Sequence, residues 1–144
     1  MALPPTLHAT VVARFARGRW RAALVRGPSG AGKSDLALRA LAAGWRLVAD
    51  DRAVVWASDG RLFARAPETL AGLIEARGQG VASVPALPMA EVVLIVDLAP
   101  EPSGLERIPQ PAWETLEGVR VRRIDLFGAE ISAPAKMALA LQRA

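Results

Sequence analysis

Cysteine is absent from the 144 residues, so neither disulfides nor cysteine metal sites can operate. Long apolar runs are absent as well, because none approaches the ~18 residues that a membrane span needs. The first five residues lack the charged start and the apolar stretch of a signal peptide. Lysine is scarce, since Lys33 and Lys136 are the only lysines among 18 basic residues. Together these features predict a soluble, cytoplasmic protein with no membrane partner.

What is present fits one globular domain over residues 1–144. Apolar residues make up 52% of the chain, and glycines and prolines punctuate them regularly, which excludes a disordered chain. The formal charge is +4, and arginines gather between residues 14 and 26. A nucleic-acid patch would interleave aromatic residues or sit on one helix face, and this segment does neither. We therefore expect solvated arginines on a hairpin and no nucleic-acid partner, while attraction to an acidic protein partner stays open.

The most informative segment is residues 27–34, Gly-Pro-Ser-Gly-Ala-Gly-Lys-Ser, which matches the phosphate-binding loop G-x-x-x-x-G-K-[ST] without a mismatch. The apolar run at 22–25 predicts a buried strand before it, and residues 35–43 predict a helix after it. In such a loop, backbone N–H groups and the helix dipole bind anionic oxygens. Lys33 would reach the β/γ-phosphates and the Ser34 hydroxyl would ligate Mg²⁺. The segment predicts binding of a nucleoside triphosphate.

The remaining pattern predicts an α/β fold with a twisted sheet and several hairpins. Strands are expected at residues 6–14, 20–26, 45–49, 53–57, 61–66, 90–98 and 119–126. The phosphate-loop helix should end at Gly44, a natural left-handed cap. A terminal helix is expected over 135–143, and residues 67–74 predict a short helix or helical turn. The β-branched stretch within 90–98 predicts burial on both faces, and the four tryptophans are expected to pack in or against the core.

Asp50 and Asp51 close the strand at 45–49, shortly after the phosphate-loop helix. Ligands gather at the carboxyl ends of strands in open α/β sheets, so both carboxylates are expected near the γ-phosphate. One would face Mg²⁺ or its water shell, while the other would accept a proton from the attacking hydroxyl. Repulsion between neighbouring carboxylates can raise one pKa towards the range useful to a base. The alternative is an exposed Asp-Asp turn.

Two further segments carry candidate site residues. Glu75 and Arg77 precede Gly78 and Gly80, and in an extended segment their spacing puts both side chains on one face. Such a loop could supply a Mg²⁺ ligand and a clamp for phosphate oxygens. A capped helix end with a surface ion pair accounts for the spacing equally well. His8, the only histidine, is from the residues alone a surface or hydrogen-bonded strand residue.

In their order along the chain, these segments resemble bacterial HPr kinase/phosphorylase, specifically its C-terminal catalytic domain. The resemblance rests on Leu7-His8, the phosphate loop, the stretch Gly-Trp-Arg-Leu-Val-Ala-Asp-Asp-Arg at 44–52 and Leu-Ile-Glu-Ala-Arg-Gly-Gln-Gly at 73–80. The resemblance implies a P-loop core related to that of phosphoenolpyruvate carboxykinase, with ATP and Mg²⁺ as cofactors. The implied substrate is a serine hydroxyl on HPr, the phosphocarrier of a phosphotransferase system.

The resemblance also implies residue roles. Asp51 would accept the serine proton in the kinase direction and donate it in the reverse direction, and His8 matches an active-site histidine of the family. The resemblance assigns Ser34 and Glu75 to Mg²⁺ and Arg107 to a further active-site position. Asp50 is assigned to Mg²⁺ as well, from its place at the strand end beside the loop. ATP would be held by Gly27, Pro28, Ser29, Gly30, Ala31, Gly32, Lys33 and Ser34, with Lys33 on the phosphates.

The chain departs from the family pattern at both ends. His8 lies almost at the start, so the usual N-terminal domain is expected to be missing, as in short proteobacterial forms linked to nitrogen-related phosphotransferase control. Near the end, residues 133–136 read Ala-Pro-Ala-Lys, where the family has a Pro-Gly-Arg-Asn-type segment tied to dephosphorylation. Kinase action is therefore implied and phosphorylase action stays open. A homo-oligomer is expected, without the hexamer of the long forms being implied.

Two other functions remain open from the sequence. A small-metabolite kinase of the P-loop type would normally have a lid segment with paired arginines. Arg120, Arg122 and Arg123 are the only candidates, and their alternation in a strand-like run predicts a solvated face instead. A non-catalytic nucleotide-binding module would be favoured by loss of the proton acceptor, but Asp51 is present.

Overall fold

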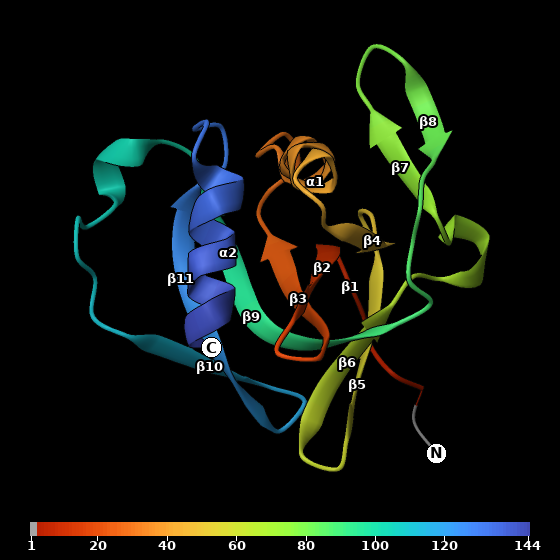
Figure 1. Cartoon of the computed structure of the whole chain (residues 1–144), viewed down its shortest axis with the longest axis horizontal. Coiled ribbons are helices and arrows are strands. Elements are labelled where there is room, and N and C mark those ends of the chain that lie inside the picture. The colour runs from red at the N-terminus through yellow and green to blue at the C-terminus, as the bar shows by residue number, and fades with distance from the viewer. Residues whose placement is uncertain (1–2) are drawn as a thin grey trace.

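The computed structural model describes residues 3–144, which form one large sheet, a separate hairpin and two helices (Figure 1). The strands of the large sheet are β1 (Thr6–Leu7), β2 (Thr10–Ala16), β3 (Arg19–Arg26), β4 (Arg46–Ala49), β5 (Ala53–Ser58), β6 (Arg61–Arg65), β9 (Ala90–Ala99), β10 (Ala112–Leu116) and β11 (Val119–Phe127). The hairpin consists of β7 (Leu73–Ala76) and β8 (Gly80–Ser83). The α-helices are α1 (Lys33–Ala42) and α2 (Ala133–Arg143), and two 3₁₀ turns are η1 (Glu68–Leu70) and η2 (Pro102–Gly104).

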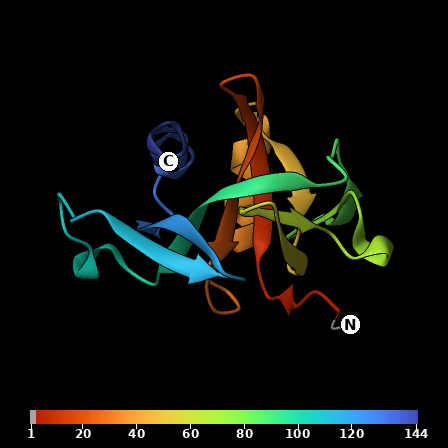
Figure 2. The ribbon, with the colours of Figure 1, turned by 90° about the horizontal axis from the view of Figure 1, so that it is seen from below.

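β9 organises the large sheet because it pairs with three other strands. Along one edge it runs parallel to β3, with Arg21–Arg26 opposite Glu91–Asp97. Along the other edge it is antiparallel to β6 through residues 90–92 and parallel to β11 through residues 94–99. The sheet therefore forks at β9, and Figure 2 shows β10–β11 extending to one side and β5–β6 to the other. The α/β class and the twisted sheet with hairpins are confirmed, and the relation to phosphoenolpyruvate carboxykinase stays a prediction.

Alternation along β3 divides the core into two layers, because successive side chains in a strand point to opposite faces. Ala23 and Val25 pack with residues of α1, α2 and β4, including Leu36. Ala22 and Leu24 face the opposite layer, which contains the hairpin β5–β6. These four β3 residues are at most 1% exposed. The buried strand expected before the phosphate loop is therefore confirmed.

Strand directions bring two distant segments to one edge of the sheet. The parallel strands β3, β9 and β11 end at the same edge, and α1 follows β3 there. β4 is antiparallel to β2, which is antiparallel to β3, so β4 also ends at that edge. The segment after β3 is the phosphate loop and the segment after β4 is Asp50–Asp51. The fold thus places the loop and the acidic pair together, as the sequence predicts.

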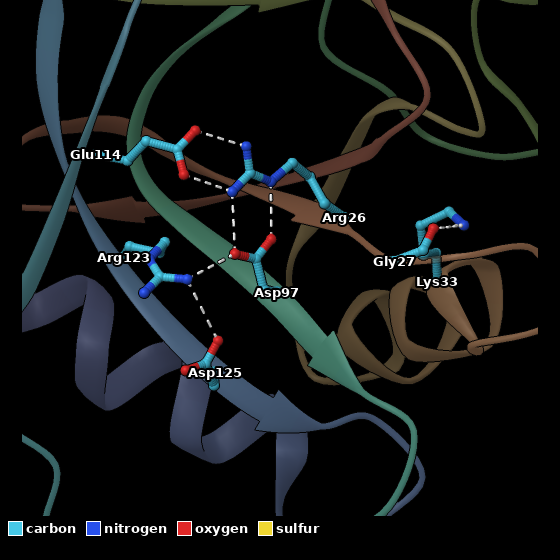
Figure 3. Close-up of polar contacts among 7 residues, drawn as sticks. All are labelled: Arg26, Gly27, Lys33, Asp97, Glu114, Arg123 and Asp125. Atoms are coloured by element: carbon cyan, nitrogen blue, oxygen red, sulfur yellow. Dashed lines mark hydrogen bonds and ion pairs between the residues drawn. The ribbon is translucent and has the colours of Figure 1, made fainter. Parts of the chain in front are cut away.

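An ion cluster fixes the end of β3 directly before the phosphate loop (Figure 3). Arg26 donates two hydrogen bonds to Asp97 of β9, at 2.8 and 2.9 Å, and two to Glu114 of β10, at 2.7 Å each. Arg123 of β11 donates to Asp97 at 3.1 Å and lies 3.6 Å from Asp125. Paired Arg–carboxylate bonds of this kind are stronger than neutral hydrogen bonds. The cluster ties together four strands at the entrance to the loop.

The cluster also sets the protonation of its members. Hydrogen bonds to Glu114 and Asp97 raise the pKa of the Arg26 guanidinium above its ordinary value. Burial raises the pKa of the Asp97 carboxyl, but the hydrogen bonds from Arg26 and Arg123 outweigh burial and leave this pKa below its ordinary value. The hydrogen bonds from Arg26 lower the pKa of Glu114. Both carboxylates therefore stay ionised at more acidic pH than free side chains would.

Several expected elements have different bounds. The strand expected at 6–14 is divided, because residues 8 and 9 leave the strand and β1 pairs with β5 instead of β3. Within 67–74 only Glu68–Leu70 is helical. Leu73 and Ile74 belong to β7, since Gly72 turns the chain with φ 75° and fully buried Ile74 packs in the layer beneath α1. The strands β8 and β10 were not expected.

The arginines and tryptophans also differ from expectation. Arg21 is not solvated but 5% exposed, because it donates to the main-chain oxygens of Leu141 and Ala144 at the end of α2. Arg26 and Arg123 are held in the ion cluster instead of facing bulk water. Trp113 is 46% exposed and lies outside the core. In the described part of the chain, no helix is long and apolar enough to cross a membrane.

Replacing Arg26 tests the ion cluster. Arg26→Gln leaves Glu114 without its cation and Asp97 with Arg123 alone, so we expect a loss of about 2 kcal/mol in the free energy of unfolding at pH 7. Because both carboxyls have lowered pKa values when folded, their stabilisation is present above their unfolded pKa values and is lost as pH falls through the folded ones. The difference between wild type and variant should therefore shrink towards pH 3. Urea unfolding at both pH values measures it, with Arg65→Gln as the matched control.

Candidate functional site

The phosphate-binding loop joins β3 to α1, and its shape depends on its glycines. A Cβ on Gly27 would lie 3.1 Å from Ala31 Cβ and 3.2 Å from Leu98 Cβ, so a side chain there would force these neighbours to shift. Gly32 caps the start of α1 in the left-handed conformation, with φ 93° and ψ 26°. Residues 28–30 are exposed. The loop is therefore both fixed in shape and open to a ligand.

Lys33 lies within this loop and not in solvent. Its Nζ donates to the Gly27 oxygen at 2.7 Å and to the Pro28 oxygen at 3.2 Å, and Figure 3 shows the side chain folded back towards Gly27. The residue is only 7% exposed. The ammonium group, the loop amides and the positive end of α1 lie together, an arrangement that favours a phosphate group.

Asp50 is the centre of the acidic strand end. It is 7% exposed, and its Oδ1 accepts hydrogen bonds from the Ser34 hydroxyl at 2.6 Å and the Thr10 hydroxyl at 3.0 Å. Its Oδ2 accepts a bond from the Glu75 main-chain N–H at 3.0 Å. Three hydrogen bonds offset the cost of burying this carboxylate. Asp50 thereby links the phosphate loop, β2 and the β7–β8 hairpin.

Asp51, unlike the buried Asp50, has an exposed side chain, which pairs with His8. Its Oδ1 lies 2.8 Å from His8 Nε2, and both side chains are accessible, at 59% and 37% exposed. Asp51 has φ 68°, a left-handed conformation that is uncommon outside glycine. Arg52 lies 3.8 Å from the second carboxylate oxygen. The two acids are thus separated into a buried, hydrogen-bonded one and an accessible one.

Thr10 holds both acids, and sequence reasoning missed it. Its hydroxyl donates to Asp50 Oδ1 and accepts the Asp51 main-chain N–H at 3.2 Å. The residue is fully buried in β2. The sequence feature that could have indicated Thr10 is a hydroxyl residue at the first position of an apolar strand, two positions after His8. One buried side chain therefore orients the whole strand end.

The hairpin β7–β8 contacts the acidic strand end through its main chain, at Glu75. The Glu75 main chain contacts Asp50, but the Glu75 side chain is exposed. Arg77 lies in the turn after β7, so the expectation of two charges on one face of an extended segment is wrong. Glu75 as a metal ligand stays a prediction, supported by its position beside Asp50.

Arg107 is not brought to this group. It is exposed in the segment between β9 and β10, which in Figure 1 lies at the end of the molecule opposite β7–β8. In residues 3–144, no hydrogen bond joins Arg107 to the acidic strand end. Its active-site role stays a prediction.

The oxygen donors at the loop suit a hard cation that also binds phosphate. No group of three His, Asp or Glu side chains with metal-site geometry occurs in the described residues. Mg²⁺ does not need such a group, because it is usually bound by one or two carboxylates together with water and substrate phosphates. Ser34 and Asp50 form one hydroxyl–carboxylate pair beside the loop. No arginine or lysine in the described chain forms an ion pair with Asp50, which leaves its charge free to face a cation.

The fold and the site together define a phosphate-binding-loop α/β protein with an accessible carboxylate beside the loop. Residues 2–95 match the family described as the HPr Serine kinase C-terminal domain. The match covers more than half of the chain, so the chain belongs to this family. The resemblance stated from the sequence is therefore confirmed.

Relatives and a solved structure agree with this assignment. The chain is 40% identical over 87 residues to the HPr kinase/phosphorylase of Clostridium perfringens strain 13, covering 60% of the chain and 27% of that protein. It is 40% identical over 89 residues to that of Streptococcus thermophilus strain CNRZ 1066, covering 61% and 28%. The chain thus spans about a quarter of the length of these relatives. A structure titled Hpr(Ser) kinase/phosphatase from Coxiella burnetii matches with a TM-score of 0.80 at 22% identity, covering 96% of this chain and 95% of the other, which shows the shared fold.

Thr10→Val tests the orienting role of Thr10. Valine keeps the shape but leaves Asp50 and the Asp51 amide each without one buried partner, so we expect a loss of about 1–3 kcal/mol in the free energy of unfolding. The Asp51 amide resonance should shift in ¹⁵N NMR spectra. Thr10→Ser keeps a hydroxyl and should retain both properties, and Thr115→Val, on an exposed position of β10, is the matched control. Equal stability of Thr10→Val and wild type would contradict this role.

Proposed function

We propose that the chain is a Mg²⁺- and ATP-dependent protein serine kinase acting on an HPr-type phosphocarrier. The observation that carries the proposal is the chain of contacts from Ser34 through Asp50 and Thr10 to Asp51 and His8. It couples a phosphate-binding loop to an accessible carboxylate. Membership in the HPr Serine kinase C-terminal domain family and the names of the relatives support the same substrate class.

The residues present fit ATP and Mg²⁺. The loop 27–34 would hold the triphosphate, with Lys33 on its β/γ-phosphates and Ser34 towards the metal ion. Asp50 already accepts three hydrogen bonds, so we assign it to the Ser34 hydroxyl and the water shell of Mg²⁺. Glu75 would complete the metal site from the hairpin. When bound, Mg²⁺-ATP supplies the phosphoryl group and the neutralising charge of the metal.

Asp51 and His8 would act on the attacking hydroxyl. Asp51 accepts the serine proton as the bond from the serine oxygen to the γ-phosphorus forms and the bond to the β,γ-bridging oxygen breaks. His8, at 2.8 Å, holds the Asp51 carboxylate in place through Oδ1. Positioning by the loop and charge stabilisation by Lys33 supply the rest of the catalysis. In the reverse direction, Asp51 would return the proton to serine, and phosphorylase action stays a prediction.

Exposure favours a protein substrate over a small metabolite. The Asp51 side chain is 59% exposed, so a serine on a protein surface can reach it. A small-metabolite kinase needs groups that enclose its substrate and exclude water. The expected lid candidates Arg122 and Arg123 lie on β11, where Arg123 is bound to Asp97. We therefore favour the protein kinase, acting as a homo-oligomer.

Substitution of Asp51 tests the proposal directly. Asp51→Asn keeps the shape but cannot accept the proton, so phosphorylation of HPr should fall about 10²–10⁴-fold while ATP binding is unchanged. Lys33→Ala should lose ATP binding itself. The measurement is transfer of labelled phosphate from ATP to one serine of purified HPr, beside a calorimetric titration of ATP. Asp59→Asn, in the β5–β6 turn and also at positive φ, is the matched control.

Two results would contradict the proposal. A near-wild-type transfer rate in Asp51→Asn would remove Asp51 as the base. ATP consumption by the wild-type chain that depends on a small metabolite and leaves HPr unlabelled would show the metabolite kinase instead.

A further inference from the structure

A hollow of about 590 Å³, which we call the interhelical groove, lies where the end of α1 meets α2. Both helices belong to the apolar layer that also contains residues of β2 and β4, and Figure 1 shows them as neighbours. The lining comes from the last part of α1, from Arg14 of β2, from Trp45 and from the segment 131–142. Because α1 has ten residues and rises about 1.5 Å per residue, roughly 10–15 Å separates the groove from the phosphate loop.

The groove is hollow because the residues that face one another across it are small. Trp45, only 3% exposed, supplies the one aromatic side chain of the lining. Water beside such carbon-rich surface is displaced favourably by an apolar ligand, which also restores the missing dispersion contacts. Four lining residues have short side chains: Ala43, Pro134, Ala135 and Ala138.

Large apolar side chains around the groove are open to solvent. Leu139 and Ile131 both line it and are 53% and 97% exposed. A neighbouring hollow of about 380 Å³ adds Phe15, which is 57% exposed. Single apolar residues on a surface need no explanation, but several around one hollow mark a binding site. The apolar character of the groove therefore extends to its borders.

Arg14 lies between the two hollows, since it lines both of them together with Ala138 and Gln142. No acidic residue lines either hollow. Within residues 3–144, no carboxylate forms an ion pair with Arg14. A guanidinium group offers pairs of N–H donors in a fixed plane. Arg14 thus places an unbalanced positive charge and unused donors beside an apolar surface.

Arg39, the other arginine of the groove, is already bound. Its Nε donates to Asp35 at 3.1 Å, and its two terminal nitrogens donate to the main-chain oxygens of Glu130 and Gly128. These bonds hold the segment between β11 and α2 against α1. A single unpaired guanidinium therefore remains at the groove, and it calls for one negative charge instead of several.

We propose that the interhelical groove binds an organic monocarboxylate with a bulky apolar body. The carboxylate pairs with the Arg14 guanidinium through two parallel hydrogen bonds, and the apolar body fills the space beside Trp45. Ligand sites commonly have volumes of about 300–1,000 Å³ and an apolar lining with a few polar groups, as this groove has. The site is separate from the phosphate loop and does not depend on the proposed kinase activity.

The probe is 2-naphthoate, and 2-naphthamide, which has the same shape without the charge, is its control. In about 0.15 M salt, which screens exposed charges, calorimetry should show saturable 1:1 binding of the acid. The acid should bind about 5-fold tighter than the amide, or more, because only the acid gains the ion pair. In ¹⁵N NMR spectra the indole N–H resonance of Trp45 should shift, and the Gly32 amide of the phosphate loop should not.

Two pairs of variants locate the binding. Arg14→Gln should weaken binding of the acid about 5-fold and leave the amide unchanged, so that the two probes bind equally. Arg46→Gln, exposed on β4 and outside the lining, is its matched control and should leave both affinities unchanged. Ala135→Trp should fill the groove and abolish binding. Ala57→Trp adds the same side chain at an exposed position of β5 outside the groove and should have no effect.

The proposal is overturned by the absence of saturable binding, by equal affinity of the wild-type chain for acid and amide, by equal weakening in Arg46→Gln, or by unchanged binding in Ala135→Trp. Displacement of the probe by an equal concentration of inorganic phosphate would reveal a general anion surface instead. A Trp45 resonance that moves on dilution of the free chain would reveal a groove covered by a second copy. If Arg14→Gln does not fold, the comparison of acid and amide on the wild-type chain decides, together with the Trp45 shift.

Discussion

The buried carboxylate of Asp50 is the contact on which the site depends. It joins three segments that the chain order keeps apart, because Thr10, Ser34 and Glu75 donate to it from β2, α1 and β7. A carboxylate in a nearly closed position is stable only while these donors are in place. One carboxylate therefore links the phosphate loop, the acidic strand end and the hairpin, in addition to the apolar packing of Ile74 beneath α1. The accessible Asp51 owes its position to the same arrangement, through the hydroxyl of Thr10.

Local sequence patterns and the family resemblance were sufficient to predict the structural features that are determined by residues close together in the sequence. The loop 27–34, the strand before it, the helix cap at Gly44 (φ 96°) and the meeting of loop and acidic pair follow from glycine spacing and strand direction. Long-range partners could not be predicted in this way. Arg26 reaches Glu114 across 88 residues, and Arg21 reaches Leu141 across 120. A single sequence gives the charges of such groups but not their pairing, so arginines expected to be solvated proved to be buried or bound.

Arginines have different partners at the two edges of the sheet. At the carboxyl ends of β3 and β11, arginines are matched by carboxylates and make the entrance to the loop rigid. At the amino end of β11, the Cζ atoms of Arg120 and Arg122 instead lie 4.3 and 5.2 Å from the centroid of the Trp113 ring. The family match ends at residue 95, whereas the structural match covers 96% of the chain. The fold is thus shared beyond the segment that family sequence patterns describe, and β11 and Trp113 lie in that part.

The parallel pairing of β3 with β9 has a consequence for the order in which the molecule is made. Residues 21–26 find their partners only at 91–97, about seventy positions later. Contacts that distant close slowly, since a long loop must first lose its freedom. During synthesis, which adds about 5–20 residues each second, the strand before the phosphate loop is made several seconds before its partner β9. Until then the edge of β3 that pairs with β9 has no partner strand. Unpaired strand edges in incompletely folded chains are prone to aggregation.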